Sequence, residues 1–425
     1  MKFKVPPIDI CQAAPFSSDP FHREPFAKLL NTTIENVDDN LVISVDSPWG
    51  HGKTTFAKQW IQSLENNGKK VILFNAFEND LHEDPFISFT GEIYAFITEH
   101  FSKELKFEEK PFLKNAGKLA SVLTTSTLKI GLNAFSAGII DNKIFEDFQN
   151  KIADTAGDMC GEMIENYTNK KEFSNKFRVD LKDLANLVRK KQGFPLTIII
   201  DELDRCRPDF ALQLLERIKH YFNVDNVTFV LFICEKQFLN HVTSTYGLNK
   251  NIESYLHKFA DLFLTLPNGK PLNNAQAYFH YMDNTAKKMS LDSENIIYTS
   301  SQLASLNQCS MRQCNQILST IVLSSNLIPL DTHWQIVALL IFFKVTNIEL
   351  LEKMALNIFN KNDLNGIYLN SAKLKGTMEH YEFMMMGPGE YESKQKKHSY
   401  YVNIGYSAFR QNNAQLAKIL LGTRY

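Results

Sequence analysis

The sequence has almost no excess of charge of either sign. Its 46 Lys and Arg residues nearly balance 47 Asp and Glu residues, which leaves a formal net charge of −1. Near neutrality argues against a global positive field that would draw the whole chain to nucleic acid or to an anionic membrane, although a local basic groove remains compatible with it. Nucleic acid is therefore a possible partner that the composition does not indicate.

Cysteine is scarce as well, and the six cysteines lack the spacing of a metal site. The first residues show no secretory signal. We therefore expect free thiols in a reducing compartment and a cytoplasmic location. The sequence also has no metal-spaced cluster of His, Asp and Glu and no nucleophile elbow, so it shows no motif of a nuclease, a protease or a deaminase.

A long, strongly apolar run is missing too. The nearest approach to one is the segment 119–140, which is rich in Ser and Thr and carries Lys129 near its middle. A membrane-spanning helix needs about 20 apolar residues. A lysine at its centre costs about 2.5–3.5 kcal/mol on an insertion scale. We expect this segment to be a packed helix or helical hairpin and not a membrane span.

What the sequence does contain is a glycine-rich loop between a strand and a helix. Residues 41–45 are typical of a buried strand, residues 47–55 read Ser-Pro-Trp-Gly-His-Gly-Lys-Thr-Thr, and residues 56–61 favour a helix. This is the context of a phosphate-binding loop, in which backbone N–H groups and a helix N-terminus hold phosphate oxygens. Ser47 replaces the first glycine of the usual pattern. The alternative is a chance turn between a strand and a helix.

We expect this loop to bind ATP together with Mg²⁺. The Lys53 ammonium is expected to reach the β- and γ-phosphates, and the Thr54 hydroxyl to ligate Mg²⁺. His51 is interpreted as a spacer and not as a catalytic group. The predicted nucleotide-binding residues of the loop are Trp49, Gly50, His51, Gly52, Lys53, Thr54 and Thr55.

A second motif follows about 150 residues later along the chain. Residues 196–200 form an apolar run that ends in Asp201 and Glu202. In a phosphate-binding-loop enzyme, a strand beside the loop strand ends in an aspartate that holds Mg²⁺ through water, and a following glutamate polarises the attacking water. An edge strand that runs into an acidic turn is the alternative for this motif alone.

The residues around both motifs resemble the KAP family of P-loop NTPases, in its soluble bacterial form. The resemblance extends from about residue 15 to about residue 325 and departs from the family at Phe77, where Trp is usual, and at Glu202, where Asp is usual. The matching segments are Asp19, Arg23 and residues 26–27, residues 49–54, residues 74–77 with 84–85, residues 203–208 and residues 214–222.

The resemblance implies roles for two arginines. Arg205 belongs to the family signature and is expected to reach a phosphate of a neighbouring subunit as a catalytic arginine, or else to pair with Asp204 or Asp209. Arg312 falls where the family has an arginine-bearing helix, and it is expected to contact the γ-phosphate or else a surface carboxylate. For Glu235, which follows an apolar strand, contact with the γ-phosphate side and capping of the next helix remain alternatives.

The expected fold is α/β: a parallel P-loop NTPase sheet of the ASCE or AAA-like kind, with a helical insertion and a C-terminal helical domain. We expect a core over residues 1–270 with the insertion at about 86–192, a helical lid over 271–372 and an extension over 373–425. The extension contains a Met-rich segment and several tyrosines, which favour docking of a partner or packing on its own helical domain.

The leading functional hypothesis is a Mg²⁺-dependent ATPase that works as a switch or motor subunit with a separate effector protein. Its assembly into a homo-oligomer and its role in bacterial defence against phages or mobile elements are implied by the resemblance. The alternatives are a nucleotide-dependent scaffold with little turnover and a DNA-translocating motor. The last of these needs a basic channel that the sequence does not indicate.

Overall fold

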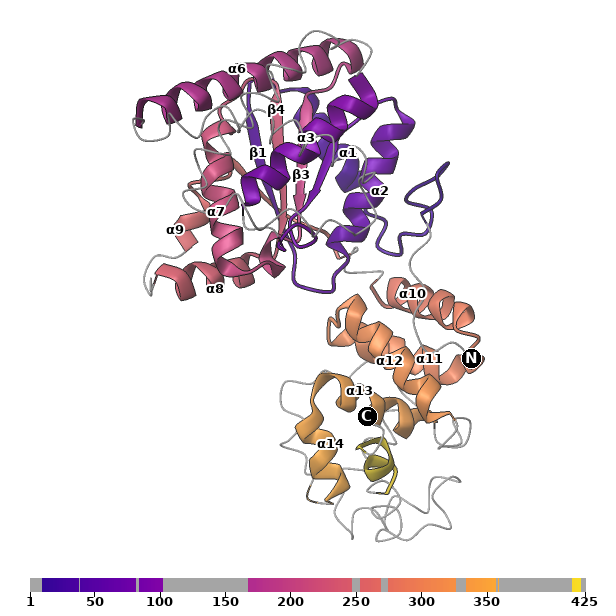
Figure 1. The fold of residues 1–425 in the computed structure, drawn as a ribbon. Helices are drawn as coiled ribbons and strands as arrows, with labels where there is room; N and C mark the ends of the chain where they lie inside the picture. Colours follow the sequence, from indigo (N-terminus) through magenta and orange to yellow (C-terminus); the bar gives the residue numbers. More distant parts are fainter. Residues whose placement is uncertain are drawn as a thin grey trace, which may run out of the picture.

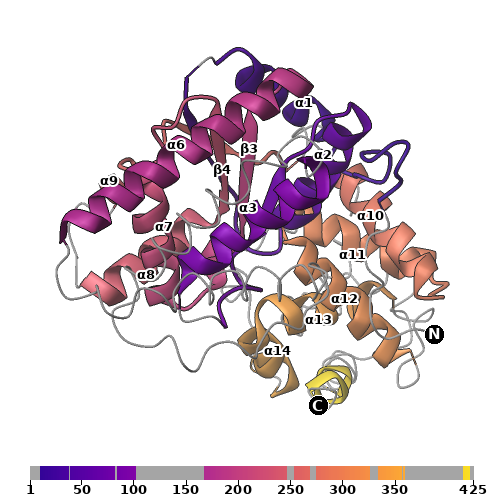
Figure 2. The same ribbon diagram turned by 45° about the horizontal axis from the view of Figure 1, so that its top comes forward.

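The computed structural model describes residues 10–37, 39–81, 84–101, 167–246, 253–268, 274–325, 334–356, 358 and 415–421. These residues form an α/β lobe and a helical lobe, which lies below the first in Figure 1. Figure 2 shows the helices of the second lobe grouped beside the lower edge of the first.

The α/β lobe is built on a parallel sheet in which the described strands follow the order β2-β3-β4-β1-β5. Every residue of β3 and β4 is buried, as a sheet covered on both faces requires. The predicted α/β class is therefore confirmed. The strands are β1 Leu41–Asp46, β2 Ile72–Asn75, β3 Leu196–Asp201, β4 Val227–Ile233 and β5 Leu262–Thr265.

The predicted direct contact between the two motif strands is wrong, because β4 lies between β1 and β3. Asp46 at the end of β1 is opposite Ile233, while Asp201 at the end of β3 is opposite Phe232. Since all three strands are parallel, their carboxyl ends still meet at one edge of the sheet, where ligands bind in open α/β sheets. The two motifs therefore lie at the same edge of the sheet, one strand apart.

Helices cover both faces of the sheet, and the alternation of strand side chains divides the core between them. Ile43 and Val45 point into a cluster with Phe56 and Trp60 of α2, whereas Val42 points into the opposite cluster. The first face is covered by α1 Glu24–Glu35 and α2 Lys53–Asn66. The second is covered by α3 Pro85–Phe101, α6 Tyr167–Gln192, α7 Pro208–Ile218 and α8 Glu235–Tyr246, and near it lies α9 Glu253–Leu256.

The helical lobe has a hydrophobic core of its own. Helix α13 supplies an unbroken buried run over residues 336–343, which explains why its sequence is apolar on all sides. Phe21 from the N-terminal segment also joins this core, and its ring meets Tyr278 edge-on at 6.0 Å. The helices are α10 Asn274–Lys288, α11 Glu294–Leu306, α12 Met311–Ser324, α13 Trp334–Thr346 and α14 Ile348–Ala355.

Part of the predicted insertion and most of the predicted C-terminal extension fall outside the described residues. These include the segment 119–140 and the Met-rich segment. Within the described ranges, no helix is long and apolar enough to cross a membrane. The described piece of the extension, residues 415–421, is helical and buries Ala417 and Leu420 in the core of the helical lobe. The Lys344 ammonium donates a hydrogen bond to the Leu420 carbonyl at 2.6 Å.

This packing predicts that the end of the chain stabilises the helical lobe. We expect Leu420→Ala to lower the free energy of unfolding by about 2–5 kcal/mol, because it removes a fully buried side chain from a packed core. Urea denaturation of the full chain measures this value. Lys418→Ala on the exposed side of the same helix is the matched control. Equal stability of the two variants would contradict the packing.

Candidate nucleotide-binding site

The glycine-rich loop joins β1 to α2 at the carboxyl edge of the sheet. The Ser47 N–H donates to the Ile233 carbonyl at 3.1 Å, so the loop starts from a fixed point on β4. Gly50 and Gly52 both have a φ of 83°, a left-handed conformation that glycine adopts without strain. The Lys53 ammonium lies back across the loop and donates to the Ser47 carbonyl.

The first turn of α2 is arranged to receive an anion. Gly52 is its N-cap residue, and among the described side chains none caps this end of the helix. The free N–H groups and the helix dipole therefore face the space in front of the loop. Lys53, Thr54 and Thr55 line a cavity of about 370 Å³ at this point.

The two predicted carboxylates lie at the end of β3, across β4 from the loop, and one of them contacts Thr54. The Thr54 hydroxyl donates to Glu202 Oε1 at 3.2 Å, and the Glu202 N–H donates to Asp201 Oδ1 at 2.8 Å. Glu202 has a φ of 61°, which is uncommon for a residue other than glycine. The structure thus brings Thr54, Asp201 and Glu202 together, although about 150 residues separate the threonine from the acids.

Burial dominates the electrostatics of Asp201. Its side chain is 2% exposed, and desolvation raises the pKa of its carboxyl group to about 6, while the nearby Thr54 hydroxyl acts in the opposite direction. His51 in the loop also has a lowered pKa, because burial disfavours its charged form. A threonine hydroxyl and a buried carboxylate are oxygen donors of the kind that Mg²⁺ prefers, so these residues fit the ion.

Arg205 pairs with a different acid from the two that the sequence suggested. Its guanidinium lies 2.7 Å from Glu202 Oε1, because the short 3-10 turn η1 Leu203–Arg205 places it three residues further along on the same side. Asp204 accepts a hydrogen bond from the indole N–H of Trp49 instead. The second oxygen of Asp204 is buried and has no hydrogen-bond partner among the described residues.

Arg312 reaches the site from the helical lobe. The backbone N–H of Arg312 donates to the Gly50 carbonyl at 3.4 Å, and the arginine lines the same cavity as Lys53 and Thr54. A Cβ atom at Gly50 would lie 2.9 Å from both Arg312 Cβ and Ser310 Oγ, so the contact requires glycine. Ser310 in turn forms a capping box with Gln313 and fixes the start of α12.

The model of the KAP family P-loop domain matches residues 23–328. The chain belongs to this family. None of the curated proteins compared with the chain matches it. Among solved structures, the Aeropyrum pernix ORC2 protein in ADPNP–ADP complexes aligns at 13% identity and a TM-score of 0.35, covering 95% of this chain and 94% of that chain. The assignment of this KAP-family chain therefore rests on the family match, and the glycine-rich loop between β1 and α2 agrees with it.

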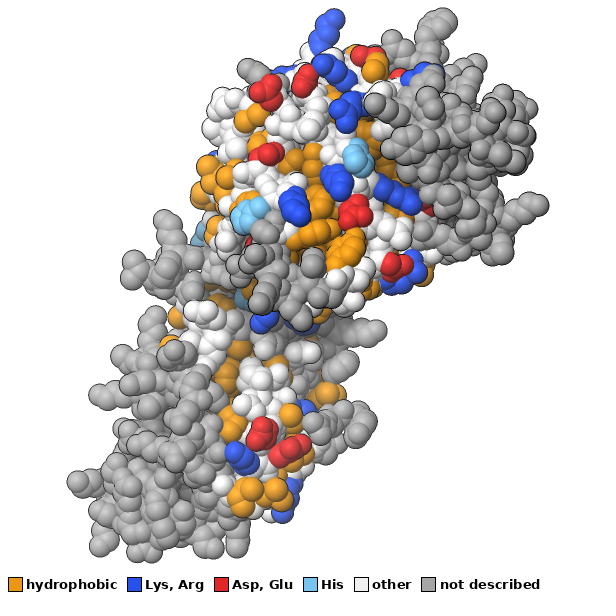
Figure 3. Space-filling view, turned by 90° about the vertical axis from the view of Figure 1, so that its left-hand side faces the viewer, with side chains coloured by type: hydrophobic (Ala, Val, Ile, Leu, Met, Phe, Trp, Pro, Cys, Tyr) orange, Lys and Arg blue, Asp and Glu red, His pale blue; other side chains and the backbone are white. Residues whose placement is uncertain are grey.

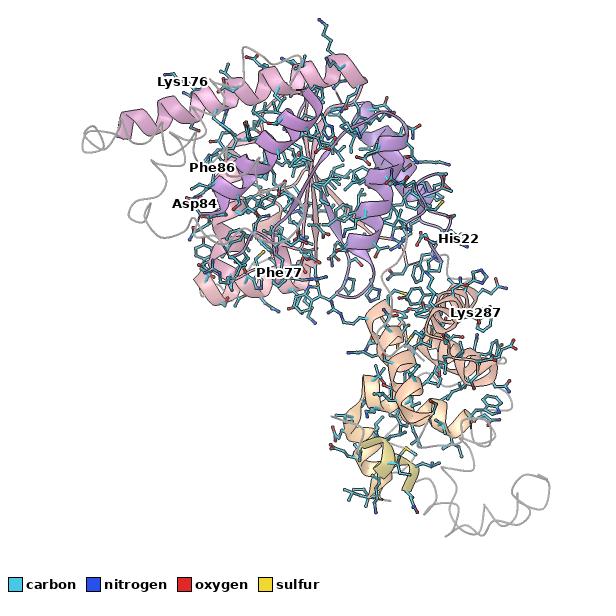
Figure 4. The ribbon with its side chains drawn as sticks, turned by 45° about the vertical axis from the view of Figure 1, so that its right-hand side comes forward. His22, Phe77, Asp84, Phe86, Lys176 and Lys287 are labelled. Atoms are coloured by element: carbon cyan, nitrogen blue, oxygen red, sulfur yellow. The ribbon has the colours of Figure 1, made fainter. Side chains whose placement is uncertain are left out.

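Two features of this KAP-family site were not predicted from the sequence. Asp19 and Arg23 carry part of the resemblance, but no pattern around them indicated that they line the cavity. For Glu235, the structure shows that Asp46 Oδ1 accepts the hydrogen bond of its backbone N–H at 2.8 Å, so β1 caps the start of α8. Phe77, at the family's usual Trp position, is 48% exposed near the carboxyl edge of the sheet (Figure 4).

The raised pKa of Asp201 predicts a cost in stability at neutral pH. Between about pH 4 and pH 6 the folded chain retains a proton that the unfolded chain has lost, so the stability of the metal-free protein falls as pH rises through this window. Asp201→Asn removes the buried charge. We expect it to raise the free energy of unfolding at pH 7, by at most about 3 kcal/mol for a shift of two pKa units, and to change it little at pH 4.

Denaturation of the metal-free protein and of the variant at both pH values measures this difference. Asp39→Asn at an exposed position is the control, and its effect is expected to be small and equal at the two pH values. A variant that is less stable than the parent at pH 7 would show that the Asp201 carboxylate is not disfavoured by burial.

Proposed function

We propose that this KAP-family domain binds ATP with Mg²⁺ and hydrolyses it. The observation that carries the proposal is the convergence of three groups on one cavity, with two carboxylates beside them. The uncapped N-terminus of α2, Lys53 and Thr54 line it, and Thr54 is hydrogen-bonded to Glu202 beside Asp201. A triphosphate needs backbone donors, a cation and a metal-binding hydroxyl at one place, and this cavity offers all three.

The residues divide the work of the proposed reaction. Lys53 and the first turn of α2 hold the phosphates, while Thr54 and Asp201 hold Mg²⁺, which when bound would screen the charge on the phosphate oxygens. Glu202 is the general base that orients the attacking water. Because Glu202 Oε1 is engaged by both Thr54 and Arg205, the reaction requires this carboxylate to turn away from at least one of them.

The structure also offers space for the nucleoside end of the ligand. A second cavity of about 810 Å³ lies between the N-terminal segment and α10, and it shares Ser18, Asp19, Pro20 and Tyr281 with the smaller one. A ligand whose phosphates lie on the loop therefore has room to extend between the core and the helical lobe. This placement supports a nucleotide as the ligand over free phosphate.

We further propose that hydrolysis drives a switch that acts on a separate effector protein, in a homo-oligomeric assembly. The contact of Arg312 with the loop supports the switch, because it joins the helical lobe to the phosphate site. The defence role rests on the resemblance to the family alone. The other candidate, a scaffold with little turnover, is favoured by the engagement of Glu202 with Arg205. Turnover measured with and without genomic neighbours separates the two.

A DNA-translocating motor has less support. Figure 3 shows Lys and Arg side chains mixed with acidic and hydrophobic ones over one face of the core, and no continuous basic stripe crosses the described residues of that face. Binding to the DNA backbone depends on such a stripe.

Two substitutions separate binding from turnover. Lys53→Ala is expected to weaken Mg²⁺–ATP binding by about a hundredfold or more, because it removes the cation of the phosphate site. Glu202→Gln is expected to keep binding and to stop hydrolysis, since the base is lost while the metal ligands remain. Calorimetric titration and phosphate release measure the two effects. Lys58→Ala, at an exposed position of the same helix, is the control. Unimpaired hydrolysis by Glu202→Gln would remove that residue from the base role.

Arg312→Ala tests the link between nucleotide and helical lobe. It keeps the backbone contact with Gly50 and removes the side chain beyond Cβ, including the guanidinium, from an exposed position, so the melting temperature of the nucleotide-free protein should change little. The affinity for ATP should fall about tenfold more than the affinity for ADP, because only ATP carries the γ-phosphate. Lys287→Ala, on the exposed side of α10, is the control. An unchanged ratio of the two affinities would leave Arg312 without a role in sensing the nucleotide.

A further inference from the structure

The carbonyl groups of a phosphate-binding loop need hydrogen-bond donors of their own. When its N–H groups turn inward toward an anion, its carbonyl groups turn outward, and buried carbonyls need hydrogen-bond donors. In this chain the His51 carbonyl accepts a hydrogen bond from a guanidinium nitrogen of Arg23 at 3.3 Å. The same nitrogen donates at 3.5 Å to the Gly52 carbonyl, which also accepts the Phe56 N–H at 2.9 Å. The donor comes from the N-terminal segment, 28 residues before His51.

Arg23 is itself held rigidly. Its side chain is 4% exposed, and Asp19 accepts hydrogen bonds from its backbone N–H at 2.7 Å, from Nε at 3.1 Å and from the second guanidinium nitrogen at 2.7 Å. The rings of Phe21 and Phe56 lie 5.4 and 5.6 Å from the guanidinium carbon. Asp19 and the aromatic rings fix the orientation of this side chain. The guanidinium nitrogen that does not bond Asp19 therefore points at the loop.

Gly52 combines the turn into α2 with room for Arg23. Its φ is 83°, a conformation that favours glycine, and a Cβ atom there would lie 3.4 Å from the guanidinium nitrogen, which is an ordinary van der Waals distance. The backbone conformation, and not a lack of space beside Arg23, therefore accounts for glycine at this position.

A role through charge alone does not account for the pair. Asp19 and Arg23 both line the cavity in front of the loop. A negative charge there would repel a phosphate, so Asp19 is explained by its hold on Arg23 and not by attraction of a ligand. Burying both charges is costly unless each is hydrogen-bonded, which the geometry provides.

We propose that Arg23, fixed by Asp19, is a positioning residue that holds the phosphate-binding loop in its nucleotide-binding conformation through the loop's carbonyl groups. The proposal rests on nucleotide binding at this loop for its effect on affinity, but its effect on the loop itself is present without nucleotide. Phe21, two residues before Arg23, packs in the core of the helical lobe. His22 lies between them, in the passage from core to helical lobe in Figure 4. Arg23 is therefore connected to both lobes, to the α/β lobe by its hydrogen bond to the loop and to the helical lobe through Phe21.

Hydrogen–deuterium exchange of the nucleotide-free chain tests directly whether Arg23 holds the loop. Arg23→Lys keeps the charge but loses the fork that binds Asp19 and the loop together. We expect exchange of the hydrogen-bonded amides of the loop and the first turn of α2, those of Ser47, His51 and Phe56, to accelerate about tenfold or more. Arg217→Lys is the matched control. Arg217 also pairs with a buried acid, Asp84, at a distance of 2.5 Å, but this pair does not contact the loop. Exchange that stays unchanged in Arg23→Lys, or that rises equally in Arg217→Lys, would overturn the proposal.

Asp19→Asn gives a second test, because the two explanations of Asp19 predict opposite changes in the affinity for Mg²⁺–ATP. If Asp19 acts by charge, its removal should tighten Mg²⁺–ATP binding; if it holds Arg23, binding should weaken, about tenfold by the loss of charged hydrogen bonds. Titration calorimetry is performed well below the melting temperature of each variant, with Arg217→Lys again as control. Tighter or unchanged binding by Asp19→Asn would overturn the proposal. Absence of binding by the parent chain would instead contradict the proposed function, and the exchange measurement would then decide alone.

Discussion

The site depends on how the outward carbonyls of the phosphate-binding loop are satisfied. The Gly50 carbonyl accepts a hydrogen bond from the Arg312 backbone N–H of α12, and the His51 carbonyl accepts one from Arg23. These donors come from the helical lobe and from the N-terminal segment. Because a carbonyl that loses its donor away from water costs free energy, the loop conformation and the positions of these two elements stabilise one another. A ligand that moves the loop therefore acts on both at once.

The sequence predicted the parts of this arrangement that have local patterns. The strand over residues 41–45, the glycine-rich loop and the strand that ends at Asp201 each follow from apolar runs and loop chemistry. The insertion of β4 between β1 and β3 could not be read in this way, because strand order depends on crossovers between distant segments. The partner of Arg205 was missed for a similar reason, since it depends on the unusual backbone conformation of Glu202.

Arg23 shows what a single sequence conceals. It lies at the start of α1, four residues after Asp19, and belongs to the family resemblance, but its contact with the loop appears only when the loop is folded against it. The site also concentrates features that cost stability elsewhere in a protein: a buried carboxylate with a raised pKa at Asp201 and an unpaired oxygen at Asp204 within the described residues. Such features are typical of sites shaped for a charged ligand and not for stability.

A crystal structure of the chain with Mg²⁺ and a non-hydrolysable ATP analogue tests the central claim most directly. We expect the triphosphate to lie in the loop, with the Lys53 ammonium moved from the Ser47 carbonyl to the phosphates and the Thr54 hydroxyl moved from Glu202 to the metal. The carbonyls of His51 and Gly52 should still be bonded to Arg23. An analogue bound elsewhere, or a Lys53 ammonium that remains on Ser47 beside a bound analogue, would contradict the account.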